Sequence, residues 1–296
     1  MLTIDPKNTP TSAVHQYLLG AVAPRPIAFA STIDKDGQAN LAPYSFFNCF
    51  SSNPPILVFS SNRRVADNTT KDTLHNIQQT REVVINVVNY AIVRQMAVAS
   101  IGFPSTSDEF VKSGLTPVES EVVRPFRVKE SPAQLECQVR DIIALGEEGG
   151  AGHLIICEVV RIHIDKGVLD EQGQIDPHKM DLMGRMGRAF YARASGEAIY
   201  KIYQNVNELS IGYDRLPLHV RNSSVLSANN LGQLAGAKAL PENSTLTQFR
   251  DHDNRIQEIL GQENIDIEAL HQYAKSVLDQ SDDRLLALKI LLQVPE

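Results

Sequence analysis

The stretch between Arg25 and Thr73 decides the fold. It reads Arg25-Pro26-Ile27-Ala28-Phe29-Ala30-Ser31-Thr32, turns, and continues Asn40-Leu41-Ala42-Pro43-Tyr44-Ser45-Phe46-Phe47-Asn48. An apolar run then ends at Ser60, and Lys71-Asp72-Thr73 opens a predicted helix. Arg, Ser, Asn, Lys and Thr at strand ends and at a helix start can hold a phosphate. The aromatic and proline-rich run between them can hold a flat ring.

The apolar pattern of the first two thirds of the chain predicts an antiparallel β-barrel with a few helices. β-prone apolar runs predict strands at residues 27–33, 56–59, 83–88, 134–145 and 153–164. Asp36-Gly37 is typical of a hairpin turn. Helical spacing is present at residues 73–80 and 92–101. Long strands joined by short turns favour a barrel.

After about Tyr213 the pattern becomes helical. Apolar residues recur with helical spacing at 224–235, 246–260, 267–278 and 284–292, and Asp282 is predicted to cap the last helix. We therefore expect a barrel domain over residues 1–212 and a helical extension over 213–296. We expect the extension to pack against the barrel, because its linker is short and its helices carry more apolar surface than a small bundle buries.

Composition excludes several classes of function. The chain of 296 residues has a formal net charge of -7 and no cluster of Lys and Arg, which argues against a nucleic-acid partner. The N-terminus does not read as a signal peptide, and no apolar run reaches the ~18 residues of a membrane span. We therefore expect a cytoplasmic protein without a membrane segment. The three cysteines, Cys49, Cys137 and Cys157, predict neither a disulfide scaffold nor a metal site, and the last two are expected to be buried.

Three motifs, in this order and spacing, resemble the flavin reductase-like FMN-binding split-barrel family, in the branch that includes flavoredoxin. They are Pro24-Arg25-Pro26-Ile27, the run from Asn40 to Asn48, and Lys71-Asp72-Thr73 followed by Asn76-Ile77. The resemblance covers roughly residues 12–212. It implies a mainly β fold with helices, a six-stranded Greek-key split β-barrel that forms a homodimer and binds FMN near the subunit interface.

The physical needs of FMN fit these motifs. Ser45 and Ser60 offer hydroxyls to the phosphate, Lys71 offers a cation, and a helix start offers free N–H groups. Asp72 is expected to cap the helix instead of facing the phosphate. Pro43 is expected to block regular strand pairing, which would leave backbone groups for the polar edge of the flavin ring. The predicted cofactor-binding residues are Arg25, Asn40, Leu41, Ala42, Pro43, Tyr44, Ser45, Phe46, Asn48, Ser60, Lys71, Asp72, Thr73, Arg185 and Arg193.

Simpler interpretations remain open for several of these residues. Lys71 and Arg25 would then be surface charges, Asn40 a turn residue, and Phe46 or Phe47 part of the core.

A second basic segment runs from Met183 to Arg193. Similar proteins carry an Arg-Gly-Gly-like turn here, followed by a Tyr and another Arg; Arg185, Tyr191 and Arg193 match, but the glycines are spaced more loosely. The resemblance implies closure over the flavin or the nicotinamide phosphates, from this or the partner subunit. The alternative is a basic surface loop.

His153 matches a His that faces the nicotinamide in such reductases, so the resemblance implies that it binds substrate. The alternative is an ordinary His at a strand edge.

The resemblance implies an FMN-dependent oxidoreductase of the NAD(P)H:flavin reductase kind. Hydride would pass from NADH or NADPH to bound FMN, and electrons on to a small molecule or a partner redox protein. One alternative is an FMN-binding electron-transfer protein without NAD(P)H reductase activity, and another is a barrel that has lost its flavin. No catalytic side chain and no metal ligand is predicted, because the flavin carries the redox chemistry.

Overall fold

The computed structural model describes residues 1–202, 207–262 and 265–294. The chain divides into two compact units, Met1–Tyr200 and Lys201–Glu296, so the division falls before the boundary expected at residue 212. Among the described residues, all strands lie in the first unit, called the barrel unit below, and the second, called the helical unit, contains helices only. No helix in these ranges is both long and apolar enough to span a bilayer.

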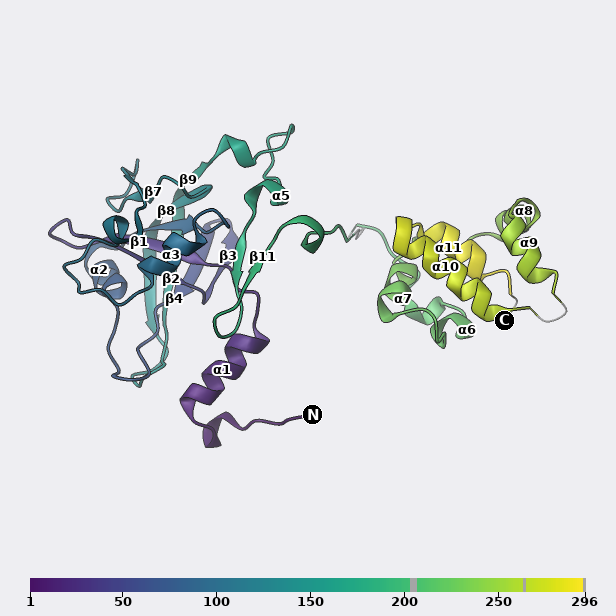
Figure 1. Ribbon diagram of the computed structural model, residues 1–296, viewed down its shortest axis with the longest axis horizontal. Coiled ribbons are helices and arrows are strands. Elements are labelled where there is room, and N and C mark those ends of the chain that lie inside the picture. Colours follow the sequence, from purple (N-terminus) through teal and green to yellow (C-terminus); the bar gives the residue numbers. More distant parts are fainter. Residues whose placement is uncertain (203–206, 263–264, 295–296) are drawn as a thin grey trace. The chain divides into compact units, whose positions relative to one another are not determined.

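The barrel unit is mainly β with helices at its surface (Figure 1). Its strands are β1 Ala28–Ile33, β2 Ala39–Tyr44, β3 Phe47–Ser52, β4 Pro55–Ser60, β5 Glu82–Val87, β6 Pro117–Val118, β7 Arg127–Val128, β8 Ala133–Ala144, β9 His153–Ile164, β10 Met183–Arg185 and β11 Tyr191–Arg193. Its helices are α1 Thr11–Ala21, α2 Asp72–Thr80, α3 Val93–Ala99, α4 Glu109–Ser113 and α5 Pro177–Met180, with 3-10 turns at Pro6–Asn8, Lys166–Val168 and Gly196–Ala198.

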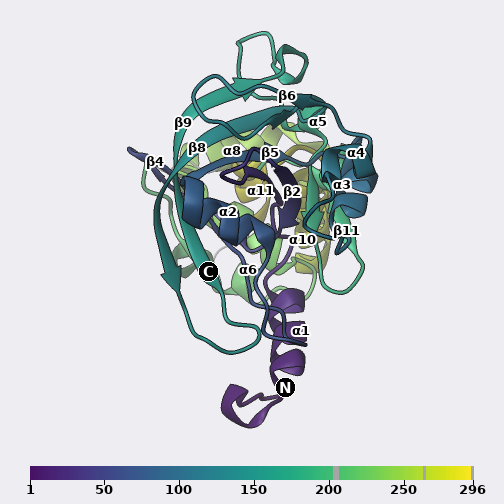
Figure 2. The same cartoon turned by 90° about the vertical axis from the view of Figure 1, so that its left-hand side faces the viewer.

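Seven strands form one antiparallel sheet in the order β2-β1-β5-β8-β9-β4-β3. Its two longest strands, β8 and β9, run side by side (Figure 2). Its two edge strands, β2 and β3, follow one another in the chain across Ser45 and Phe46 but do not pair. The sheet is therefore a split barrel that is not closed, which confirms the predicted fold class. It contains one strand more than the six that the resemblance implied.

The sheet buries apolar side chains on both of its faces. Phe59, Leu74 and Ile155 belong to a cluster that joins α2 to the strands, and Met96 and Phe110 belong to a second cluster beneath α3 and α4. Cys137 and Cys157 are buried as predicted, and burial raises the pKa of both thiols.

Pro43 does not interrupt the sheet, so that expectation was wrong. It lies inside β2 opposite Phe29, in an unbroken register with β1. The N–H of Leu41 donates to Glu109 Oε2 (3.1 Å), on the side away from β1. Because backbone groups alternate along a strand, the nitrogen of Pro43 faces the same outer side. A proline on the free side of an edge strand removes no ladder hydrogen bond.

The helical unit contains a 3-10 turn at Tyr213–Arg215 and the helices α6 Leu218–Arg221, α7 Ala228–Ala235, α8 Asn243–His252, α9 Asn254–Leu260, α10 Ile267–Ser281 and α11 Arg284–Leu291. The helix predicted over 246–260 is broken at Asp253, whose side chain accepts the N–H of Ile256 and caps α9. Asp282 does not cap the last helix. It ends α10 with φ 51°, and Asp283 caps α11 through the N–H of Leu286.

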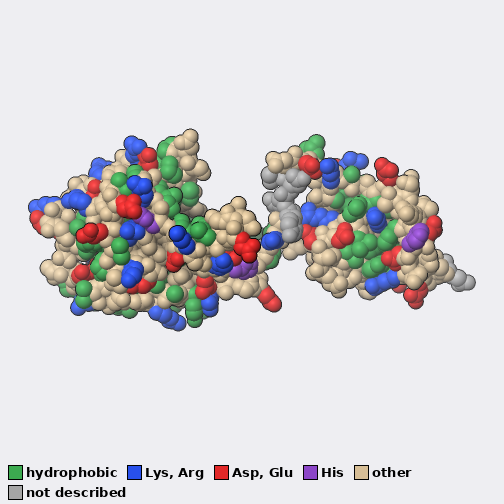
Figure 3. All heavy atoms as spheres, turned by 90° about the horizontal axis from the view of Figure 1, so that it is seen from above, with side chains coloured by type: hydrophobic (Ala, Val, Ile, Leu, Met, Phe, Trp, Pro, Cys, Tyr) green, Lys and Arg blue, Asp and Glu red, His purple; other side chains and the backbone are tan. Residues whose placement is uncertain are grey.

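The helical unit has a hydrophobic core of its own. Leu234, Ile256, Leu270 and Leu288 are fully buried in this core. Every helix of the unit except α8 contributes at least one fully buried residue, and α8 contributes the partly buried Phe249. Part of its apolar surface nevertheless stays exposed, as at Leu218 (62%) and Leu285 (51%). Packing of the extension on the barrel stays a prediction. Acidic and basic side chains are interspersed over the visible face of each unit (Figure 3).

Candidate functional site

The start of α2 lacks a side-chain cap. Lys71 occupies the N-cap position in an extended conformation, and no side chain accepts a hydrogen bond from the first turn. The expectation that Asp72 caps the helix was wrong, because Asp72 is already the first helical residue. The N–H groups of Asp72 and Thr73 have no partner within the helix and are available to an acceptor.

Lys71 stands against an aromatic ring. Its Nζ lies 4.7 Å from the centroid of the Tyr44 ring. Burial, with a smaller contribution from the nearby Arg64, lowers the pKa of Lys71. A half-buried ammonium next to a second cation does not fit the alternative of a solvated surface charge, and it creates a positive potential at the start of α2.

The hydroxyls of Tyr44 and Ser61, near Lys71, are buried and make no hydrogen bond of ordinary geometry among the described residues, although Tyr44 is close enough to the Ser61 and Thr73 hydroxyls for them to act on its pKa. Tyr44 packs on Phe59 with ring centroids 5.1 Å apart, and burial raises its pKa to about 12 despite the nearby hydroxyls of Thr73 and Ser61. An unsatisfied buried polar group costs about 1–3 kcal/mol. The two orphaned hydroxyls therefore fit a site that a polar ligand completes, and the donor set suits the phosphate of FMN.

The loop after β4 adds two residues that the sequence analysis missed, Arg63 and Arg64. The positive charge of Arg64 contributes to lowering the pKa of Lys71 and opposes the rise in the pKa of Tyr44. Arg63 Nη1 donates to the carbonyl of Asn68 (2.9 Å). Two consecutive arginines shortly after the end of a buried strand were the available signal. A Cβ on Gly149 would lie 3.0 Å from the Val65 carbonyl, so only glycine allows this close approach to the loop.

His153 borders the same loop. The N–H of His153 donates to the carbonyl of Ser61, and the N–H of Ser61 donates to that of His153, both at 3.1 Å. The imidazole is buried, with Nδ1 3.2 Å from the Ser61 carbonyl. The structure therefore brings the predicted substrate-binding residue next to the candidate phosphate site. Ser60, also buried, hydrogen-bonds through Oγ to Asn62 Oδ1 (2.8 Å).

Asn40 and Thr73 connect the sheet to α2. The Asn40 amide donates to Thr73 Oγ1 (2.9 Å) and to Thr32 Oγ1 (3.1 Å), and the buried Asn76 donates to the same Thr32 hydroxyl. Asn40 is therefore a half-buried link in a polar network, which does not fit an ordinary turn residue.

Arg25 is buried and its guanidinium is occupied by the protein itself. It donates to the carbonyls of Leu19 and Val22 at the end of α1 (both 2.7 Å), to that of Met186 (3.1 Å) and to Ser45 Oγ (3.4 Å). It also lies 5.9 Å from the Phe46 ring centroid. Arg25 is thus no surface charge; it joins α1, the β10–β11 hairpin and the turn between the two sheet edges.

The two arginines of the second basic segment lie in different surroundings. Arg185 pairs with Arg25 through backbone hydrogen bonds and stacks on Tyr191, 4.5 Å from its ring centroid. Arg193 makes a two-point ion pair with Asp181 (2.6 and 2.8 Å) and lies over Tyr90. Arg185 therefore lies beside Arg25, whereas Arg193 is held by Asp181 and Tyr90.

The remaining predicted residues are spread over both sheet edges. Leu41 is fully buried in the core beneath α3, Ala42 packs on the core beside α2, and Pro43 is half-buried. Asn48 is exposed on β3, where its Oδ1 accepts the N–H of Cys49. Leu41, Ala42 and Pro43 can therefore offer only backbone or apolar contact to a ligand.

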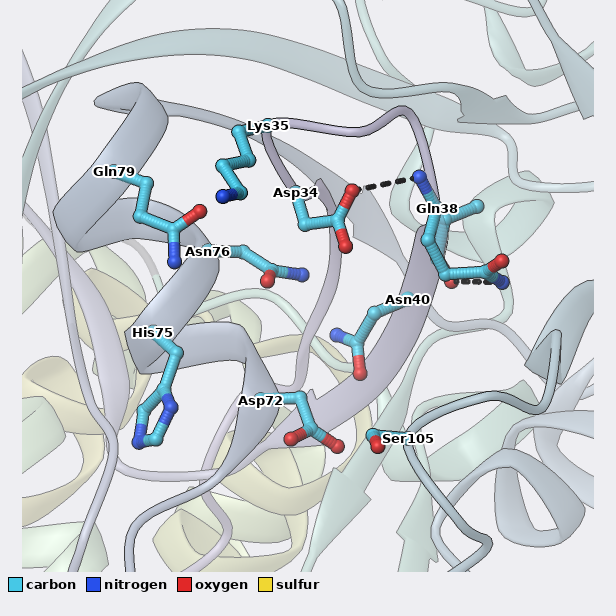
Figure 4. Close-up of a pocket in the computed structure, with 10 residues that line it drawn as sticks. Asp34, Lys35, Gln38, Asn40, Asp72, His75, Asn76, Gln79 and Ser105 are labelled. Atoms are coloured by element: carbon cyan, nitrogen blue, oxygen red, sulfur yellow. Dashed lines mark hydrogen bonds between the residues drawn. The ribbon is translucent and has the colours of Figure 1, made fainter.

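A separate polar pocket lies between α2 and the β1–β2 turn (Figure 4). Asp34 and Asp72 line it with Lys35 and His75. Its carboxylates outnumber its lysine, so it does not suit a phosphate. Lys71 and Arg64, the cations that suit a phosphate, are not among the residues that line this pocket.

Comparisons with known proteins place this geometry in a family. Residues 20–183 match the flavin reductase like domain. An uncharacterised protein of Aquifex aeolicus is 37% identical over 66% of this chain and 97% of its own length. Among solved structures, nitrilotriacetate monooxygenase component B from Bacillus cereus is 31% identical over 68% of this chain and 98% of its own, with a TM-score of 0.63. Flavoredoxin of Desulfovibrio vulgaris shares the fold, with 22% identity over 69% and 99% and a TM-score of 0.53. The chain belongs to the flavin reductase-like family.

Proposed function

We propose that this protein binds FMN and is an NAD(P)H-dependent oxidoreductase of the flavin reductase kind. The observation that carries the proposal is the pair of orphaned buried hydroxyls, Tyr44 and Ser61, beside the Lys71 ammonium at the start of α2. Hydroxyls, an ammonium and free helix N–H groups together match a phosphate. When bound, FMN would supply the redox chemistry by taking hydride from NADH or NADPH and passing electrons to an acceptor.

The chain's own residues would bind and orient the cofactor. Lys71, Ser61 and the N–H groups of Asp72 and Thr73 hold the phosphate, with Arg64 adding positive potential. The Asn40 amide, which donates to Thr73 at the start of α2, and the backbone of β2 would offer hydrogen bonds to the rest of the cofactor. We propose that Arg25 and Arg185 act by fixing the Ser45–Phe46 turn, which borders the ring, and that His153 lies on the donor's side.

We also propose that the protein is a homodimer. The edge strand β3 has an unpaired side and carries the 68%-exposed Phe50. An unpaired edge with a large exposed apolar side chain favours association. In a dimer with a two-fold axis, the same contact would cover the β3 edge of each copy. Light scattering that finds a monomer still holding stoichiometric FMN would contradict this.

Cofactor identity and donor reactivity test the function. Mass spectrometry of the released cofactor should find FMN and not FAD, because the sequence has no GxGxxG fingerprint for an adenosine half. Anaerobic addition of NADH or NADPH should bleach the flavin absorbance. A yellow protein that neither donor bleaches would be an electron carrier instead, with a partner redox protein as its donor. We propose that the protein works in the cytoplasm, where both dinucleotides are available.

A further inference from the structure

The polar pocket beside α2 has the dimensions of a subsite. Its volume is about 200 Å³. Pockets that enclose whole small ligands measure roughly 300–1,000 Å³. The pocket can therefore take one sugar of a larger molecule and not the whole molecule. Asp72, His75 and Gln79 on its rim are exposed, so a dissolved ligand can reach it.

The pocket shares a wall with the candidate flavin site. Asn40 lines the pocket and donates to Thr73 Oγ1 (2.9 Å), and Asp72 directly follows Lys71 at the start of α2. One ligand-facing side of this helix start is therefore cationic and the other acidic. Asn40 and the first turn of α2 are therefore common to the pocket and to the candidate phosphate site.

The lining suits hydroxyl groups. Asp34 Oδ1 accepts the N–H groups of Asp36 and Gln38, while Asp34 Oδ2 and both Asp72 oxygens have no hydrogen-bond partner among the described residues. The side-chain amides of Asn76 and Gln79 add donors and acceptors (Figure 4). Carboxylates accept hydrogen bonds from ribose hydroxyls, whereas a 2′-phosphate requires a nearby Arg. The pocket lining includes no Arg.

We propose that this pocket receives the adenosine ribose of the dinucleotide donor and that Asp34 and Asp72 select NADH against NADPH. The inference rests on the proposed function and deepens it by naming the donor. The 2′-phosphate of NADPH would meet two carboxylates, with Lys35 as the one lysine in the lining to offset them, and juxtaposed like charges are unfavourable.

The test uses the full-length FMN-loaded protein and two readouts. Isothermal titration compares ADP-ribose with 2′-phospho-ADP-ribose as binding probes, and anaerobic stopped flow compares flavin bleaching by NADH and NADPH. We expect the unphosphorylated form to be favoured about tenfold or more in both. Asp72→Asn should reduce the preference several-fold, and Gln79→Arg should reduce or reverse it. Asp36→Asn, an exposed residue on the same turn but outside the pocket, is the matched control and should change nothing.

A preference for the phosphorylated probe would overturn the inference, as would a preference that Asp72→Asn and Gln79→Arg leave unchanged. Failure of the proposed function looks different. Neither donor would then bleach the flavin, while the titration with ADP-ribose would still report on the pocket.

Discussion

The barrel unit buries many polar side chains, whereas the helical unit buries almost only apolar ones. In the barrel unit, Arg25, Ser60, Ser61 and Thr73 are all buried around β2, β4 and the start of α2. In the helical unit the buried polar residues are Asn230, His271 and Gln293, and each hydrogen-bonds to the unit's own side chains or backbone. Burying polar groups is unfavourable unless they are paired. The orphaned hydroxyls of Tyr44 and Ser61 fit the proposed ligand site, whereas most buried polar groups in the described part of the helical unit are paired, Arg221 Nε being an exception.

The largest effect should come from the core of the helical unit. Leu288→Ala removes a fully buried side chain of α11 and should lower the free energy of unfolding of that unit by about 2–5 kcal/mol. Chemical denaturation followed by circular dichroism measures it. Leu285→Ala on the same helix is the control, because Leu285 is 51% exposed and its loss should change stability by about 0.5 kcal/mol or less. Loss of FMN from the Leu288 variant would show that the stability of the helical unit affects the candidate site of the barrel unit.

Gly152→Ala should damage the candidate site of the barrel unit by crowding it, and not by leaving a cavity. A Cβ on Gly152 would lie 2.5 Å from Ser60 Oγ and would push the β4 end that leads to Ser61. Crowding of this kind costs about 1–3 kcal/mol, so FMN affinity measured by fluorescence quenching should fall roughly five-fold or more. Gly102→Ala is the control, because a Cβ there meets nothing within 4 Å. Equal affinities in the two variants would contradict the placement of Ser60 and Ser61.

The units should also differ in their response to acid. His271 hydrogen-bonds to His219 and Ser223, and burial, with His219 adding to it, lowers the pKa of His271 from its ordinary 6.5. A depressed folded-state pKa means that the stability is present above pH 6.5 and is lost as the pH falls through the folded value.

In the barrel unit the matching group is Glu136. Burial tends to raise its pKa, but N–H donors from Glu121, Val122 and Val123 and the His163 ring lower it below its ordinary 4.5. This contribution is therefore present above pH 4.5 and is lost only as the pH falls through the folded value. Melting curves between pH 7.5 and 5 should show the helical unit weakening first. Simultaneous loss of both units would contradict the separation, and His271→Gln should remove the dependence that sets in below pH 6.5.

The sequence predicted the long elements of the barrel unit well, because their apolar runs are continuous. The strand predicted at 153–164 is β9, and the strand at 134–145 differs from β8 by a single residue at each end. Pro43 was misread because its effect depends on which side of β2 its nitrogen faces, and that is a property of the sheet. Arg64 was missed because a solvated loop arginine and one that acts on Lys71 look alike in a sequence, and the backbone hydrogen bonds that shape this loop, such as those from Arg64 to Thr69 and from Gly150 to Arg63, are known only from the fold.

In the helical unit the sequence located the helices but not their ends. Asp253, Asp282 and Asp283 are all potential caps, and only the backbone decides which of them accepts an N–H group. The apolar pattern also did not reveal that these helices pack their apolar faces against one another, because periodicity alone does not say what an apolar face packs against.

The central claim is that the start of α2 holds the phosphate of FMN through Lys71, and the dissociation constant of FMN for Lys71→Ala tests it most directly. A charged contact of this kind contributes about 1.5–3 kcal/mol, so affinity should fall between about tenfold and a hundredfold while the melting temperature of the apoprotein is kept. Lys112→Ala in the exposed part of α4 is the matched control and should bind FMN as the parent does. An unchanged dissociation constant for Lys71→Ala would contradict the account.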